Sequence, residues 1–90
     1  MSDKRVEIIK RILIDDLFVE LPAERIGLED GLQSVHGLDS FAFAELRMLC
    51  ERHFNVDIRD EDFTPDNFRN VKVLLQLIER LQVGQARAAS

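Results

Sequence analysis

Apolar residues recur at helical spacing in three stretches of the chain, the first of which covers about residues 6–17. Ser2 or Asp3 can cap the helix that this pattern predicts, and Pro22 lies beyond its end. The apolar positions of this helix are Val6, Ile8, Ile9, Ile12, Leu13 and Leu17.

The second helical stretch begins within VHGLDSF, residues 35–41. Asp39 or Ser40 can cap a helix that starts here and ends near Phe54, before Asn55 interrupts the pattern. At about 100° per residue, its larger apolar face is expected to lie on the core. The members of that face are Ala42, Phe43, Leu46, Leu49, Cys50 and Phe54.

A smaller apolar stripe lies on another side of the same helix. This docking stripe comprises Phe41, Ala44 and Met48, with Glu45, Glu51 and Arg52 around it. Because an isolated domain has no need of such a stripe, we interpret it as a contact surface for partner proteins. The alternative is that Phe41 and Met48 belong to the core, which would follow if the first helical turn departs from ideal geometry.

A third helix is predicted to begin after Asn70, which can cap it, and to end at Gly84. Just before it, Thr64 as a cap and Pro65 as the first helical residue predict one short helix of a single turn. The apolar positions of the third helix are Val71, Leu74, Leu75, Ile78 and Leu81, flanked by Val73 and Leu77.

These elements predict an all-α fold, a small antiparallel bundle of three main helices plus one short helix. A long loop, about residues 19–39, joins the first two main helices, and loops of this length usually have a function. Residues 1–82 are expected to form a single domain and residues 83–90 a flexible tail. The loop should pack on the core because apolar residues are scattered through it, at Leu21, Ile26, Leu28, Leu32 and Val35.

Acidic residues are concentrated in the middle of the chain, whose formal net charge is −5. Residues 15–30 carry a net charge of −5 and residues 39–62 of −4. Such a surface repels nucleic-acid phosphates and favours basic partners, so we expect no nucleic-acid binding. Charges every few residues near the N-terminus leave no apolar core for a signal peptide or a membrane span. We expect a monomeric, cytoplasmic protein that does not bind membranes.

Ser40, His36 and Asp39 are the residue types of a hydrolase triad. Nucleophilic catalysis needs the base within hydrogen-bond reach of the hydroxyl, whereas adjacent residues at a helix start point in diverging directions. The pattern also offers no oxyanion hole or substrate cleft. We therefore assign no catalytic residue and expect that the protein is not an enzyme.

Metal binding is also disfavoured. The single cysteine, Cys50, excludes an internal disulfide, and no second pair of ligands completes a site with Cys50 and His53. The acidic run at residues 57–62 lacks the central glycine and the terminal glutamate of a calcium loop. We expect a buried thiol, a histidine at a helix end and a solvated acidic edge.

The neighbours of Ser40 suit a group attached to its hydroxyl better than they suit catalysis. Gly37 allows left-handed backbone, and Asp39 places a carboxylate beside the hydroxyl. The start of the helix directs amide N–H groups and a partial positive charge toward the same place. An anionic group on Ser40 would therefore be stabilised.

The chain resembles the acyl and peptidyl carrier proteins, the phosphopantetheine-binding domains, in four consecutive segments. These are GLDSF at the start of the second helix, ELRMLCERHFNVDI within and after it, the acidic DEDF, and FTPDNFRNVKVLLQLIERL. The resemblance covers about residues 6–81. It is specific because the short serine motif follows a long loop in an acidic chain of ninety residues.

The resemblance implies that Ser40 receives 4′-phosphopantetheine from coenzyme A. A separate, magnesium-dependent phosphopantetheinyl transferase would make this transfer, assisted by Asp39, which would help to hold the metal or the basic surface of the transferase. The docking stripe corresponds to the surface that this family presents to partners. The implied partners are an acyl- or aminoacyl-loading ligase or transferase and downstream acyl-processing enzymes.

The sequence differs from that of the fatty-acid carriers at several positions, and these differences favour a carrier in another pathway. Those carriers usually have leucine after the serine and a strongly acidic second helix. Here Phe41 follows the serine and Ala42 replaces a frequent acid, while Arg47, Arg52 and His53 reduce the negative charge. We expect a free-standing carrier in a specialised polyketide, nonribosomal peptide or related acyl-transfer pathway. The alternatives are a housekeeping fatty-acid carrier and an unmodified helical adaptor that binds a partner through the docking stripe.

Overall fold

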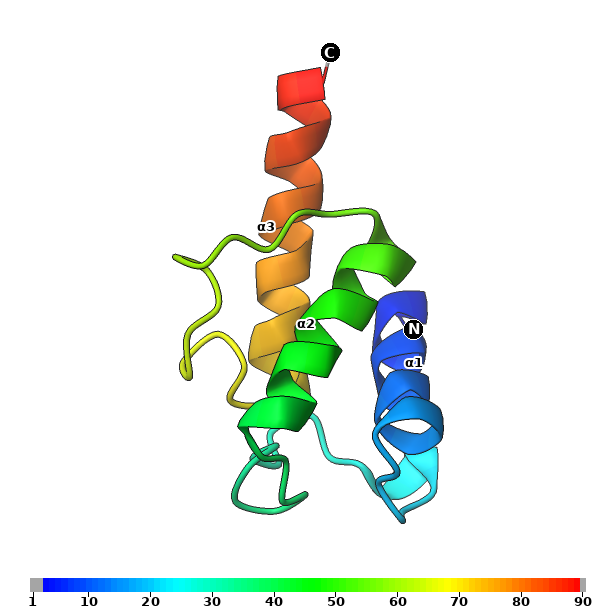
Figure 1. Ribbon diagram of the computed structural model, residues 1–90. Coiled ribbons are helices and arrows are strands. Elements are labelled where there is room, and N and C mark those ends of the chain that lie inside the picture. The colour runs from blue at the N-terminus through cyan, green and yellow to red at the C-terminus, as the bar shows by residue number, and fades with distance from the viewer. Residues whose placement is uncertain (1–2, 90) are drawn as a thin grey trace.

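The computed structural model describes residues 3–89, with side chains as far as residue 85. Its elements in chain order are α1 (Lys4–Arg11), the π-helical turn η1 (Ile12–Asp16), the 3-10 turn η2 (Ala23–Arg25), α2 (Ser40–Phe54) and α3 (Val71–Ala89). The three long helices surround one core, and α1 runs opposite to α2 and α3 (Figure 1). Within the described residues there is no strand, and the predicted all-α bundle is confirmed.

The first predicted helix forms, but its winding changes partway along. The Arg5 N–H donates to Asp3 Oδ1 at 2.9 Å, so Asp3 is the cap, while Ser2 lies outside the described residues. This bond and the Arg5 guanidinium hold the pKa of the Asp3 carboxyl below its ordinary value. α1 then continues into η1, where the consecutive Ile12 and Leu13 are both buried.

The long loop between η1 and α2 packs on the core, as predicted. Its buried residues are Val19, Ile26, Leu32 and Leu38. The Leu32 N–H donates to the Arg69 carbonyl at 2.8 Å, and the Lys72 N–H donates to the Leu28 carbonyl at 2.9 Å. These two bonds hold the loop against the start of α3. The side chains of Leu28 and Val35 are exposed, contrary to the expectation that they pack on the core.

Each main helix contributes its predicted apolar face to the core. From α2 the buried residues are Leu46, Leu49, Cys50 and Phe54, with Ala42 and Phe43 partly buried against them. From α3 they are Val71, Leu74, Leu77 and Ile78. The Asn70 side chain caps α3 as expected, because its Oδ1 accepts the Val73 N–H at 2.9 Å.

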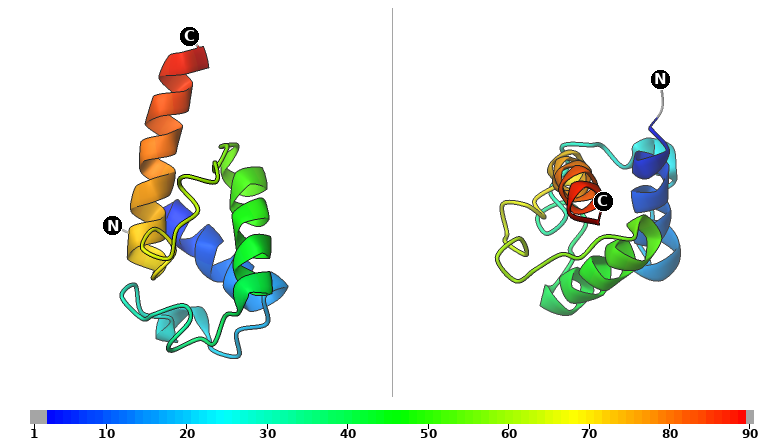
Figure 2. Two further views of the ribbon diagram at one scale, coloured as in Figure 1. Left: turned by 60° about the vertical axis from the view of Figure 1, so that its left-hand side comes forward. Right: turned by 90° about the horizontal axis from the view of Figure 1, so that it is seen from above.

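Two boundary predictions are wrong. α3 does not end at Gly84 but continues to Ala89, and its far end extends beyond the other helices (Figure 2). A glycine inside a helix costs about 1 kcal/mol, yet the helix continues through Gly84, and the neighbouring Gln85 bonds to the chain after α2. Its amide accepts the Asp57 N–H and donates to the Asp57 carbonyl, both at 2.9 Å. The domain boundary at residue 82 and the flexibility of residues 83–90 stay predictions, and Ser90 lies outside the described residues.

The other wrong boundary concerns the short helix expected at Thr64. Residues 65–68 form a turn and not a helix. The Phe68 N–H donates to the Thr64 carbonyl at 3.2 Å and the Asn67 N–H to Thr64 Oγ1 at 3.2 Å. Thr64 therefore caps one turn, as predicted, but the chain leaves the helical path directly afterwards, at the buried Phe68.

Candidate functional site

The start of α2 presents Ser40 to solvent. Asp39 is the cap, since its Oδ1 accepts the Ala42 N–H at 2.8 Å. Ser40 is thus the first residue of the helix, and its side chain is exposed. Because Asp39 supplies the cap, the Ser40 hydroxyl is not needed to cap the helix. This hydroxyl forms no hydrogen bond within the part of the chain that the structure describes.

Gly37 bends the chain just before Asp39. Its φ of +72° lies in the left-handed region, as predicted, and no atom would obstruct a side chain there. A substitution would therefore be disfavoured by backbone strain and not by crowding. The bend is held in place by Leu38, which is buried and whose N–H donates to the Leu32 carbonyl at 3.0 Å.

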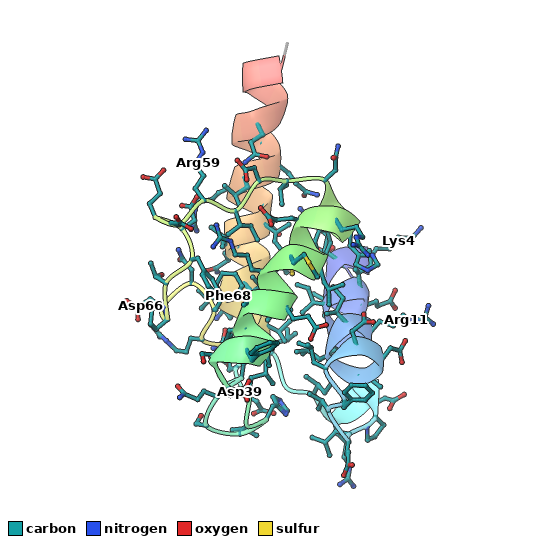
Figure 3. The ribbon with its side chains drawn as sticks, viewed as in Figure 1. Lys4, Arg11, Asp39, Arg59, Asp66 and Phe68 are labelled. Atoms are coloured by element: carbon teal, nitrogen blue, oxygen red, sulfur yellow. The ribbon has the colours of Figure 1, made fainter. Side chains whose placement is uncertain are left out.

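A groove of about 530 Å³ adjoins Ser40. Its walls come from the start of α2, from the turn at residues 31–34 and from the segment at residues 63–69. Figure 3 shows Asp39 at the lower end of α2, with Phe68 and Asp66 on the segment alongside. Most of the exposed lining is apolar, with a rim that contains the ion pair between Arg69 and Asp66 at 3.0 Å. A flexible group attached to Ser40 would find room here.

Arg47 and Glu51 hold the chain that leads from α2 to the groove wall. The Arg47 guanidinium donates to the Ile58 carbonyl, with 2.9 Å from Nε, and Glu51 Oε2 accepts the Ile58 N–H at 2.9 Å. The guanidinium also lies 4.9 Å from the ring centroid of Phe63. Phe63 in turn contacts Phe68 edge to face, at 5.0 Å between centroids.

This role of Arg47 was not predicted from the sequence, in which Arg47 is apparent only as a charge that reduces the acidity of α2. The spacing of four between Arg47 and Glu51 places both residues on one helix face, but it does not reveal that they share the peptide groups of Ile58.

The docking stripe is on the surface. Phe41 is 84% exposed and Met48 is 49% exposed, so the alternative that they belong to the core is wrong. Ala44, Glu45 and Arg52 are exposed as well. The structure therefore places all five of these residues where a partner could reach them.

The rejected triad residues do not act together. His36 is partly buried, and its Nε2 has no hydrogen-bond partner among the described residues. Asp39 is engaged with the backbone of α2. Neither residue is hydrogen-bonded to Ser40, which would be needed to activate the hydroxyl as a nucleophile.

Cys50 and His53 lie in different environments. Cys50 is fully buried, and burial raises the pKa of its thiol to about 12, whereas His53 is exposed. The described residues bring together no group of three or more histidine, cysteine, aspartate or glutamate side chains that could hold a metal ion.

Comparison with known proteins adds one match. The model of the family described as Phosphopantetheine attachment site matches residues 7–78, from α1 to the middle of α3. None of the curated proteins that were compared matches the chain significantly. Of the described helices, none combines the length and the hydropathy that crossing a bilayer requires. The chain belongs to the family of phosphopantetheine attachment domains, which carry 4′-phosphopantetheine covalently and include the acyl and peptidyl carrier proteins.

Proposed function

We propose that the protein carries 4′-phosphopantetheine on Ser40 and presents acyl, aminoacyl or peptidyl thioesters to partner enzymes. The observation that supports this most directly is the exposed Ser40 hydroxyl at the first turn of α2. It is free of structural bonds within the described residues and adjoins an open groove.

The local charges fit the phosphodiester that would link the group to the chain. Amide N–H groups at the start of α2 point toward Ser40, and the helix dipole stabilises an anion there by about 0.3–1 kcal/mol. The carboxylate of Asp39 opposes this effect. Because that carboxylate already accepts the Ala42 N–H, part of its charge is neutralised by the helix.

When bound, the group supplies a flexible arm with a terminal thiol that holds cargo as a thioester. Docking of the carrier then makes the reaction with a partner enzyme effectively intramolecular. The protein itself would act as a carrier and not as a catalyst. Its expected partners are a phosphopantetheinyl transferase, a loading ligase or transferase, and downstream acyl-processing enzymes in the cytoplasm.

We propose that the protein acts in a specialised polyketide, nonribosomal peptide or related acyl-transfer pathway. Support comes from the surface of α2, where the exposed Phe41 takes the place of the usual leucine and the exposed Arg52 and His53 reduce the negative charge. Arg47 does not contribute to this difference, because it is directed toward Ile58 and Asp60.

Incubation with coenzyme A and a broad-specificity phosphopantetheinyl transferase tests the proposal. We expect the intact mass to rise by one phosphopantetheine, and fragmentation to place the addition on Ser40. A second readout uses thiol reactivity under native conditions. Cys50 should not react because it is buried with a pKa of about 12, so one reactive thiol should appear only after modification. No mass gain with several active transferases would contradict the proposal.

The role of the Asp39 charge in modification can be tested separately from the role of Asp39 as the helix cap. Asp39→Asn keeps a side chain that caps as well as aspartate, so the free energy of unfolding should hardly change. Modification by the transferase should nevertheless slow at least several-fold, since the charge is lost. Asp39→Ala should lose about 1 kcal/mol of stability as well. Equal modification rates for the wild type and Asp39→Asn, measured by mass spectrometry over time, would show that the charge is not used.

Phe41→Asp tests the docking stripe. A charge at this 84% exposed position should change the free energy of unfolding by less than about 0.5 kcal/mol. If the ring enters a pocket on the transferase, kcat/KM for modification should fall by about tenfold or more. Val83→Asp, on an exposed site of α3, is the matched control. A loss of similar size in the control would rule out a specific effect of the stripe.

A further inference from the structure

Phe18 combines two features that stability alone disfavours. Its side chain is 80% exposed, and its φ of +60° lies in the left-handed region. It follows Leu17, the C-cap of η1. There the Leu17 N–H donates to the Ile12 carbonyl at 3.1 Å and the Val19 N–H donates to the Leu13 carbonyl at 2.9 Å. Glycine is the usual residue where a helix ends in this way, because a side chain there is strained. The strained backbone therefore carries an aromatic ring that lies in solvent, and the fold gains little stability from burial of this ring.

A second exposed apolar side chain lies beside it. Val35 is 59% exposed and lines the same shallow hollow as Phe18, together with Leu21 and Glu20. We call Phe18 and Val35 the Phe18 patch. It is separate from the docking stripe in the sequence, since it is built from the two ends of the long loop and not from α2.

Acidic residues flank Phe18 along the chain, and one of them, Glu20, lines the hollow together with His36. Asp15, Asp16 and Glu20 lie within three residues of Phe18, and all three are exposed. Residues 12–24 contain no lysine or arginine. An aromatic ring with an acidic border complements an apolar socket with a basic border.

One turn of the long loop connects the patch to the groove at the modification site. The turn at residues 31–36 separates two hollows: Gln33 and Ser34 line the groove that contains Ser40, whereas Val35 lines the hollow that contains Phe18. The end of η1 and the turn at residues 31–36 both lie at the end of the bundle where α2 begins (Figure 1). An enzyme that brings coenzyme A within bonding distance of the Ser40 hydroxyl must cover the surface next to it.

We propose that the Phe18 patch is a contact for the phosphopantetheinyl transferase that modifies Ser40, which receives the Phe18 ring in an apolar socket bordered by basic residues. This inference rests on the proposed modification of Ser40. It adds a contact outside the docking stripe and explains why a strained position holds an exposed phenylalanine.

Phe18→Gly gives a test in which stability and recognition change in opposite directions. Glycine relieves the backbone strain, so the thermal midpoint should rise or stay unchanged. The loss of the ring should lower kcat/KM for modification by about tenfold, as expected when an aromatic side chain that fills a pocket on the partner is removed. The assay contains the full chain, coenzyme A and a broad-specificity phosphopantetheinyl transferase, and it follows the gain in mass.

Three further variants make the result specific. Phe18→Asn, which also tolerates left-handed backbone, should show the same loss, so that the loss cannot come from the added flexibility of glycine. Glu20→Lys should lower kcat/KM and weaken its dependence on salt, because it removes one attraction to a basic partner. Val83→Ala, at an exposed site on α3, should leave kcat/KM unchanged.

The outcomes separate this inference from the proposed function. Modification of the wild type, with Phe18→Gly and Phe18→Asn modified within twofold of its rate, would overturn the contact and leave the carrier function intact. A wild type that is never modified would overturn both. A tenfold loss in both variants, with folded protein and an unaffected Val83→Ala, would support the contact.

Discussion

Replacing Ser40 with alanine will leave the protein without phosphopantetheine, whichever active transferase is used. The substitution removes the hydroxyl that accepts the group and little else. Because Asp39 caps α2, the helix loses no cap, and alanine is favourable at a first helical residue. The variant should therefore unfold at the urea concentration of the wild type while its mass after incubation with coenzyme A stays unchanged.

Ser34→Ala is the matched control, because Ser34 is an exposed serine that lines the same groove. It should gain one phosphopantetheine as the wild type does. A modified Ser40→Ala protein would place the attachment elsewhere. If Ser40→Ala restores function fully in a strain that lacks the protein, the unmodified adaptor becomes the better description.

Phe68→Ala should destabilise the protein by about 3–5 kcal/mol, the range for truncating a buried phenylalanine. Phe68 is 2% exposed, and its ring contacts Phe63 edge to face at 5.0 Å. A domain of this size is stable by only about 5–15 kcal/mol, so the loss would remove a large part of the free energy of unfolding. Urea denaturation followed by circular dichroism measures the effect.

Phe41→Ala removes the same atoms from an exposed position and is the control for stability. Since Phe41 is 84% exposed, its truncation should change the free energy of unfolding by less than about 0.5 kcal/mol. Equal losses in the two variants would mean that Phe68 is not part of the core. A loss for Phe68→Ala well below 3 kcal/mol would mean that the groove collapses around the missing ring.

The helical periods were enough to predict the main helices, because each presents one apolar face to a common core. The caps at Asp39 and Asn70 were also predictable, since the hydrogen bond that defines a cap is local to the chain. For the same reason the bend at Gly37 was foreseen. These features together place Ser40, and so the location of the candidate site follows from local signals.

Features that depend on distant contacts were not predictable. Gly84 would be expected to end α3, yet the helix continues, and Gln85 bonds to Asp57 from 28 residues away. The Arg47 and Glu51 side chains find their shared partner Ile58 only once the chain after α2 has folded back. The strained backbone at Phe18 was likewise not predictable, because the pattern of apolar residues does not distinguish an exposed phenylalanine from one in the core.

The burial of Cys50 has a consequence for any cargo that the protein carries. Thioesters are lost to thiolates by exchange, and a carrier that holds a reactive cysteine of its own could intercept the group meant for its partner. Cys50 is the single cysteine of the chain, and in the core its thiol stays protonated at neutral pH. The lifetime of a loaded thioester would then be limited by water and by the partner enzymes, and not by self-acylation of the carrier.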